Sequence, residues 1–192
     1  MYLLKNKKAL STVVTTLIIL VVAVLLATVV TFYAINVITT RVQEESLAVY
    51  MPHIWYNTTG NWAEAAVEIV NTGGKDVVIT SLTVRGQAVT WSNVYYSRAS
   101  TPYSVDLAVT NVSLPTLMKA GSANNTYLAD GKTLITLVQD NGEITVKSGA
   151  TIVLYIASPD SIALNDVGTT VGITAFTANA QYYKEDNVQA AQ

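Results

Sequence analysis

The chain has 192 residues, enough for one long helix and one domain of ordinary size. Only 12% of the residues are charged and the net charge is −2, so no basic patch remains that would favour nucleic acid as a partner. The absence of cysteine excludes disulfides, thiolate metal sites and a cysteine nucleophile.

The first predicted element is an apolar run with no charged residue between Lys8 and Arg41. About 20 apolar residues already span a bilayer as a helix, so this run is longer than one crossing needs. Three lysines precede it and few cations follow, which predicts an N-terminus inside and the rest of the chain outside the cell. We expect a hydrophobic helix over residues 10–50, ending near 48–50, and a hinge over residues 51–60 that contains Pro52.

The start of the chain differs from an ordinary secretory signal, because the apolar run is too long and no A-x-A site follows it. Lys7-Lys8-Ala9 followed by Leu10-Ser11-Thr12 resembles the class III signal peptide of type IV prepilins. The resemblance implies cleavage between Ala9 and Leu10, with Lys8, Ala9 and Leu10 as the cleavage-site residues and residues 1–9 as the leader. Val14 stands where bacterial pilins usually carry a glutamate, so the chain is most similar to archaeal pilins and archaellins.

This resemblance implies a structural subunit, not an enzyme, of an archaeal type IV pilus-like filament on the cell surface. Within this class we favour an adhesive pilin over an archaellin of a motility filament. The implied partners are further copies of the chain, a prepilin peptidase, an assembly ATPase and a membrane platform protein. The subunit would sit in the cytoplasmic membrane before assembly. The alternative is a signal-anchored extracytoplasmic domain that binds a ligand or an S-layer partner.

Two features of the apolar run favour packing against other helices over lipid alone. Uncharged polar residues recur in it, and neighbouring helices can hydrogen-bond them. In addition, Ala23, Ala27 and Thr31 follow one another at intervals of four and form a stripe of small side chains, which lets helix backbones approach closely. We take Thr16, Ala23, Ala27 and Thr31 as candidate helix-packing residues.

The rest of the chain, residues 61–192, reads as short antiparallel strands separated by turns, which predicts an immunoglobulin-like β-sandwich and an α+β fold class overall. Two strands around Asn71-Thr72-Gly73-Gly74 form the clearest predicted hairpin, and Asp140-Asn141-Gly142 is a strong turn signal. The expected strands are 63–70, 76–85, 87–91, 103–112, 133–138, 143–146, 151–157 and 168–177. The expected core residues are Ile79, Leu82, Val84, Leu107, Val109, Leu134, Ile152, Leu154, Ile156, Val171 and Ile173.

Residues that could carry chemistry are sparse. His53 is the only histidine, and at the predicted hinge it is expected to be a surface or interface residue. Asp140, Glu143, Asp160 and Asp166 fall in predicted loops without the spacing of a calcium-binding loop, which leaves loop-bound calcium as an alternative. No catalytic fingerprint is present, so we predict no catalytic, cofactor-binding or metal-binding residue and no cofactor.

Three N-glycosylation sequons begin at Asn57, Asn111 and Asn124. All three fall in predicted loops on the exported side of the membrane, where this modification is permitted. We expect at least one of them to carry a glycan.

Overall fold

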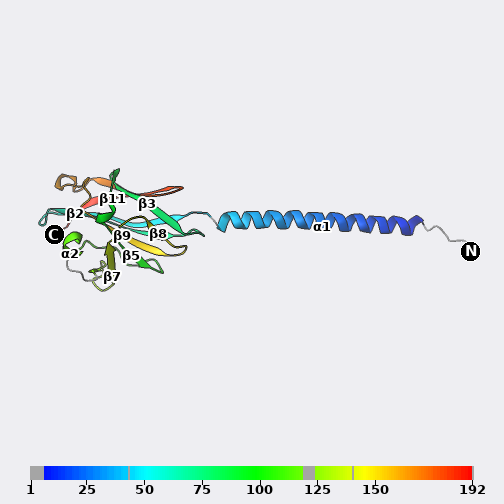
Figure 1. The fold of residues 1–192 in the computed structure, drawn as a ribbon, viewed down its shortest axis with the longest axis horizontal. Helices are drawn as coiled ribbons and strands as arrows, with labels where there is room; N and C mark the ends of the chain where they lie inside the picture. The colour runs from blue at the N-terminus through cyan, green and yellow to red at the C-terminus, as the bar shows by residue number, and fades with distance from the viewer. Residues whose placement is uncertain (1–6, 43, 119–123, 140, 192) are drawn as a thin grey trace, which may run out of the picture. The chain divides into compact units, whose positions relative to one another are not determined.

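The structure is a computed structural model that describes residues 7–42, 44–118, 124–139 and 141–191 (Figure 1). The chain divides into two compact units, Met1–Gln43 and Glu44–Gln192. The described residues of the first unit form a single helix, and the second unit, which we call the β-domain, is built on a mostly antiparallel sheet. The expected α+β class is therefore confirmed.

Helix α1 spans Lys7–Val42, and its 36 residues correspond to a length of about 54 Å at 1.5 Å per residue. The side chains of residues 11–40 are all exposed, and the segment Ser11–Thr40 is long and apolar enough to cross a membrane. A helix without a polar face has no side that prefers water. Its apolar surface therefore requires cover from lipid or from other proteins.

The helix ends earlier than the expected position near residues 48–50. Leu47 is buried in the β-domain and pairs with Asn71, so the chain has already entered the sheet at this point. Residues 51–57 lie in strand β1 (Leu47–Asn57), and the predicted hinge over 51–60 is wrong. Pro52 instead sits at a register shift in β1, next to Met51 with a φ of 47°, where its missing N–H costs the sheet no hydrogen bond.

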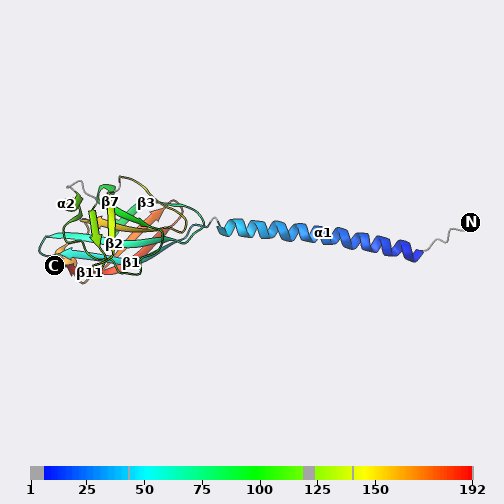
Figure 2. The same ribbon diagram turned by 90° about the horizontal axis from the view of Figure 1, so that it is seen from below.

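Eleven strands form the β-domain in the described residues, and the two views show them from different sides (Figures 1 and 2). Their order in the sheet is β4-β3-β10-β11-β1-β2-β9-β5-β7-β6, with β8 paired to β3. All strand pairs are antiparallel except β1 with β11. Besides β1, the strands are β2 (Trp62–Asn71), β3 (Val77–Val84), β4 (Gln87–Ala88), β5 (Val94–Ala99), β6 (Asn124–Tyr127), β7 (Leu134–Gln139), β8 (Ile144–Val146), β9 (Thr151–Ala157), β10 (Thr170–Thr177) and β11 (Gln181–Ala191). Three short helical turns complete the domain: η1 (Trp91–Asn93), α2 (Leu114–Met118) and η2 (Leu164–Asp166).

Two hydrophobic clusters hold the β-domain together, one on each face of β2 and β9. The inner cluster joins these strands to β3, β8 and β10 and includes Ile54, Ile69, Ile79, Leu82 and Ile156. The cover cluster lies on the opposite face and includes Trp55, Tyr95, Leu107, Leu128 and Tyr155. Residues 100–113, which we call the cover segment, pack over it. Every residue of β9 is buried because both of its faces are covered.

The predicted hairpin around Asn71-Thr72-Gly73-Gly74 is wrong. β2 pairs with β1 and β9, whereas β3 pairs with β4, β8 and β10, so the turn carries the chain from one part of the sheet to another. β7 and β8, on either side of residues 140–142, are likewise unpaired with each other, and Asp140 itself lies outside the described residues. A two-residue turn at Arg85-Gly86, both with positive φ, instead joins β3 to β4.

Nine of the eleven expected core residues are buried. Val109 packs partly buried against the cover cluster, and Leu134 is 47% exposed. The error at Leu134 comes from the phase of β7, in which Ile135 and Leu137 face inward and Leu134 faces solvent.

Candidate functional site

The surface of α1 is the first candidate site, because the sequence predicts that it packs against other helices. Its threonine hydroxyls donate hydrogen bonds to carbonyl oxygens of the same helix: Thr16 to Val13 at 2.9 Å, and Thr31 to Ala27 at 2.7 Å. Thr15, Thr28, Thr39 and Thr40 do the same. These hydroxyl protons are therefore satisfied within the helix, and another helix can use their oxygens only as acceptors.

The small-residue stripe of Ala23, Ala27 and Thr31 lies on this exposed helix, as the i, i+4 spacing requires. The predicted cleavage-site residues Lys8, Ala9 and Leu10 belong to the first turns of α1 by backbone, so the helix begins before the predicted cut. Their side chains lie outside the described part of the chain.

The segment by which the chain enters the β-domain is firmly held. The buried Glu45 carboxylate accepts hydrogen bonds from the Thr177 hydroxyl and from Asn179 Nδ2 at 2.8 Å, and it lies 3.8 Å from Lys75 Nζ. Burial raises the pKa of Glu45, but these hydrogen bonds and the Lys75 charge outweigh burial, so its pKa is lower than usual. The Ser46 carbonyl accepts the backbone N–H groups of Thr72 and Gly73. A mechanical force applied at the start of the β-domain is therefore transmitted directly to the sheet through these hydrogen bonds.

Gly73 is required by this close packing, and we predict that Gly73→Ala destabilises the β-domain. A Cβ at this position would lie 2.6 Å from the Glu44 carbonyl oxygen and 2.7 Å from the Ser46 nitrogen, so the backbone must shift. Overpacking of this kind costs about 1–3 kcal/mol of unfolding free energy. Urea denaturation of the full chain in detergent measures the loss. Gly142→Ala is the matched control, since a Cβ there meets nothing within 4 Å; equal effects of the two substitutions would refute the argument.

Two buried glutamates of β2 hold the cover segment in place. Glu68 accepts a hydrogen bond from the Tyr103 N–H at 2.7 Å, and Glu64 accepts one from the Thr110 N–H at 3.0 Å. Both side chains are almost fully buried. Residues 103–112 were expected to form a strand, but they form none; these carboxyl groups satisfy two of their N–H groups in place of a neighbouring strand.

The hydrogen bonds around Thr110 indicate that Glu64 carries a proton. Thr110 Oγ1 lies 2.5 Å from Glu64 Oε2 and 2.9 Å from the Val112 carbonyl oxygen. The hydroxyl has one proton and faces two acceptors, so the second contact becomes a hydrogen bond only if Glu64 supplies the other proton. Consistently, burial raises the pKa of Glu64 to about 7, although the bonds from Thr110 act in the opposite direction. Sequence patterns did not reveal this site, because the two glutamates contact residues 35 and 46 positions away along the chain.

His53 lies in β1 rather than in a hinge, and its side chain is only 16% exposed. Its Nε2 hydrogen-bonds Asp106 Oδ1 at 2.7 Å, and its Nδ1 lies 3.3 Å from Asp186 Oδ2. The ring stacks on Trp55 with centroids 5.0 Å apart. His53 therefore links the cover segment to β11. The sequence predicts a surface or interface residue at a hinge, and of this prediction the hinge position is wrong.

The acidic residues considered for calcium do not gather into one place. Asp166 pairs with Arg85 at 2.7 Å, whereas Glu143 and Asp160 are exposed. Within the described ranges, no group of three His, Cys, Asp or Glu side chains is arranged to hold a metal ion.

The three sequons have different surroundings. Asn57 is 8% exposed at the end of β1, and its Oδ1 accepts the N–H groups of Thr59 and Gly60. Asn124 is the first residue of β6, and its side chain lies outside the described part. The expected loop positions are therefore wrong for these two residues. Asn111 is exposed in an irregular segment, so it is the best-placed acceptor of the three.

No protein-family model matches this sequence, and neither does any curated protein sequence. Among solved structures, the chain has a likeness to the one described as "Complete structure of manganese lipoxygenase of Gaeumannomyces graminis and partial structure of zonadhesin of Komagataella pastoris". The likeness has a TM-score of 0.23 and 15% sequence identity, and it covers 76% of this chain and 45% of that one. A likeness this low carries no conclusion about fold or function.

Proposed function

We propose that this chain is the structural subunit of an archaeal type IV pilus-like surface filament, which assembles by bundling its N-terminal helices. The observation that carries the proposal is the surface of α1, which is exposed and apolar on every side from Ser11 to Thr40. These 30 residues correspond to about 45 Å of helix, against about 30 Å for the hydrocarbon core of a bilayer. A bundle of identical helices would cover the entire length, including the turns that a bilayer leaves over.

The energetics agree with a transfer from lipid to a bundle. Leaving lipid gains such a helix little hydrophobic energy, because lipid tails are as apolar as its own side chains. In the finished filament, returning a helix to water would cost about 25 cal/mol for each Å² of apolar surface exposed. Extraction therefore needs external work, which fits an assembly ATPase and a membrane platform protein as partners, while the assembled filament is stable without them.

In this proposal the β-domain forms the outer sheath as an immunoglobulin-like sandwich. The antiparallel pairing and the inner cluster between β2–β9 and β3–β10 support that assignment. The fixed entry segment at Glu45 and Ser46 suits a subunit that transmits tension between filament core and sheath. An exposed Asn111 suits a glycosylated, adhesive filament, with an archaellin as the alternative within the same class.

The second candidate is a signal-anchored extracytoplasmic domain that binds a ligand or an S-layer partner. The observation that favours it is that the α1 threonine hydroxyls donate hydrogen bonds within the helix, such as Thr28 to the Val24 carbonyl oxygen at 2.8 Å. A helix whose hydroxyl protons are already bonded can also remain in lipid. The two candidates differ in what happens at the leader, because only the filament subunit needs cleavage before the apolar helix.

Processing at the leader tests the proposal. We expect the mature chain to begin at Leu10 by mass spectrometry, and we expect Lys8→Glu to abolish both cleavage and fibres by altering the charge next to the cut. Lys184→Gln, at an exposed position of β11, is the control and should be processed normally. An intact Met1 on the wild-type chain at the cell surface, or normal cleavage of Lys8→Glu, would count against the filament assignment.

A further inference from the structure

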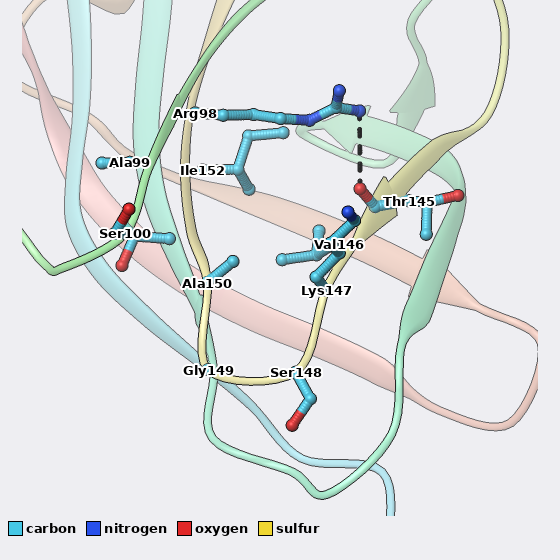
Figure 3. Close-up of a pocket in the computed structure, with 11 residues that line it drawn as sticks. Arg98, Ala99, Ser100, Thr145, Val146, Lys147, Ser148, Gly149, Ala150 and Ile152 are labelled. Atoms are coloured by element: carbon cyan, nitrogen blue, oxygen red, sulfur yellow. Dashed lines mark hydrogen bonds between the residues drawn. The ribbon is translucent and has the colours of Figure 1, made fainter.

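A cavity opens where β5 and β8 end and β9 begins (Figure 3). Its volume is about 670 Å³, and residues 98–100 and 145–152 line it. Sites for small molecules usually measure about 300–1,000 Å³. The cavity therefore has the size of a small-molecule site, and it lies wholly within the β-domain.

Arg98 is held in position at this cavity. Its guanidinium carbon lies 4.7 Å from the centre of the Tyr96 ring, and its Nη2 donates a long hydrogen bond of 3.5 Å to the Thr145 carbonyl oxygen. A guanidinium group has five N–H donors in a planar fork. Most of these donors are left for a ligand, and the aromatic ring beneath limits the loss of side-chain freedom on binding.

Two cations line the cavity, and one carboxylate lies beside it: Asp76 Oδ1 accepts a hydrogen bond of 2.9 Å from the N–H of Ser148, which is a lining residue. The second cation is Lys147, and Figure 3 shows Arg98 and Lys147 extending toward Thr145. None of the eleven lining residues is acidic, and in the described parts of the chain neither cation forms an ion pair. Elsewhere in this acidic protein Lys75 lies beside Glu45 and Arg85 beside Asp166. An anion in the cavity would relieve the repulsion between the two cations.

The remaining lining gives the ligand its class. Ser100 and Thr145 are exposed hydroxyl residues at the cavity, and Val146 and Ile152 supply an apolar floor. A planar guanidinium group recognises a carboxylate through two parallel hydrogen bonds. We propose that this cavity binds a small carboxylate whose body carries hydroxyl groups, such as an acidic sugar, with Arg98 gripping the carboxylate and Lys147 adding positive charge.

The test is a titration of the full chain in detergent micelles, followed by amide chemical shifts in NMR spectra. Glucuronate is the probe, glucose is its uncharged counterpart, and acetate carries the carboxylate without the hydroxyls. We expect saturable shifts at residues around the cavity with glucuronate, weaker binding of acetate and no binding of glucose. Arg98→Gln should weaken glucuronate binding about tenfold or more, as the loss of a charge-assisted pair predicts. Lys147→Gln should weaken it less.

Lys184→Gln is the matched control, because it removes one exposed cation of β11 that does not line the cavity. The proposal is wrong if glucuronate gives no saturable shifts, if glucose binds equally well, or if Lys184→Gln weakens binding as much as Arg98→Gln. It is also wrong if glucuronate does not bind while Arg98→Gln lowers fibre yield, since the cations would then serve contacts between copies. Because the site lies within the β-domain, binding can be found or refuted whether or not the chain forms filaments.

Discussion

Replacing Glu64 by glutamine is expected to make the β-domain more stable at pH 8 by about 3 kcal/mol and to remove the part of its pH dependence that Glu64 causes. The unfolded chain loses the Glu64 proton near pH 4.5, whereas the folded chain keeps it up to about pH 7. Between these values the folded state binds more protons, so the free energy of unfolding falls as the pH rises. The difference between these two pKa values corresponds to about 3 kcal/mol of unfolding free energy, all of which is lost by pH 8.

Glutamine is a close mimic of the protonated acid at this position. Its amide N–H can donate to Thr110 Oγ1 and its carbonyl oxygen can accept the Thr110 N–H, so both contacts of Glu64 persist. We therefore expect the variant and the wild type to have similar stability at pH 4.5. Urea denaturation of the full chain in detergent at the two pH values measures the difference.

Other acids change this slope in known directions. Burial raises the pKa of Glu68, so it adds a decline in stability with rising pH that Glu64→Gln leaves in place. The pKa of Glu45 is lowered, so Glu45 stabilises the folded state above pH 4.5, and this contribution is lost as the pH falls below that value. Glu143→Gln, at an exposed position, is the control and should keep the wild-type slope. A wild-type stability that does not fall from pH 4.5 to pH 8, or a Glu64→Gln slope equal to the wild type, would refute a protonated Glu64.

Enlarging the small-residue stripe of α1 is expected to have the largest effect on assembly. Ala27→Leu keeps the helix apolar, so the chain should still enter the membrane in normal amounts. The larger side chain holds neighbouring backbones apart, because close approach depends on small residues along one face. We expect fibre yield to fall at least tenfold, measured by quantifying the chain in sheared surface material against the membrane fraction.

Val29→Leu is the control for this substitution, because Val29 lies on the opposite side of the helix from Ala27 at 100° per residue. It should leave both membrane insertion and fibre yield near normal. Equal yields from Ala27→Leu and wild type would show that the stripe does not mediate close helix packing.

The sequence predicts best those elements whose signal is local. The apolar run predicts α1 because a long uncharged apolar segment is a signal contained in the run itself. The run 151–157 coincides with β9, a short buried strand bounded by turn residues. The predicted strand at 168–177 matches β10 closely for the same reason.

Pairing and boundaries depended on distant residues and could not be predicted in the same way. The polar strand β11 has no alternating pattern, yet it is fixed by pairing with both β10 and β1. The sequence of β1 is interpreted as a helix end and a hinge, because Pro52 suggests a break. Its assignment as a strand depends on pairing with β2, which the local sequence does not show. The cover segment has the composition of a strand, but Glu64 and Glu68 replace its strand partner.

The candidate sites divide along the same line. The stripe on α1 follows from spacing within one helix, so sequence alone can propose it. The Glu64–Thr110 contact joins residues 46 positions apart, and the cavity brings Arg98 to the β8–β9 turn. No local sequence pattern predicts either the Glu64–Thr110 contact or the cavity.

The central claim is that copies of α1 cover one another in a filament. Shearing cells, imaging the released material by electron microscopy and identifying its protein by mass spectrometry tests the claim most directly. The account predicts long fibres composed of this chain, beginning at Leu10. Retention of the chain in the membrane fraction, extracted by detergent as single copies, with none of it in surface fibres, would contradict the account.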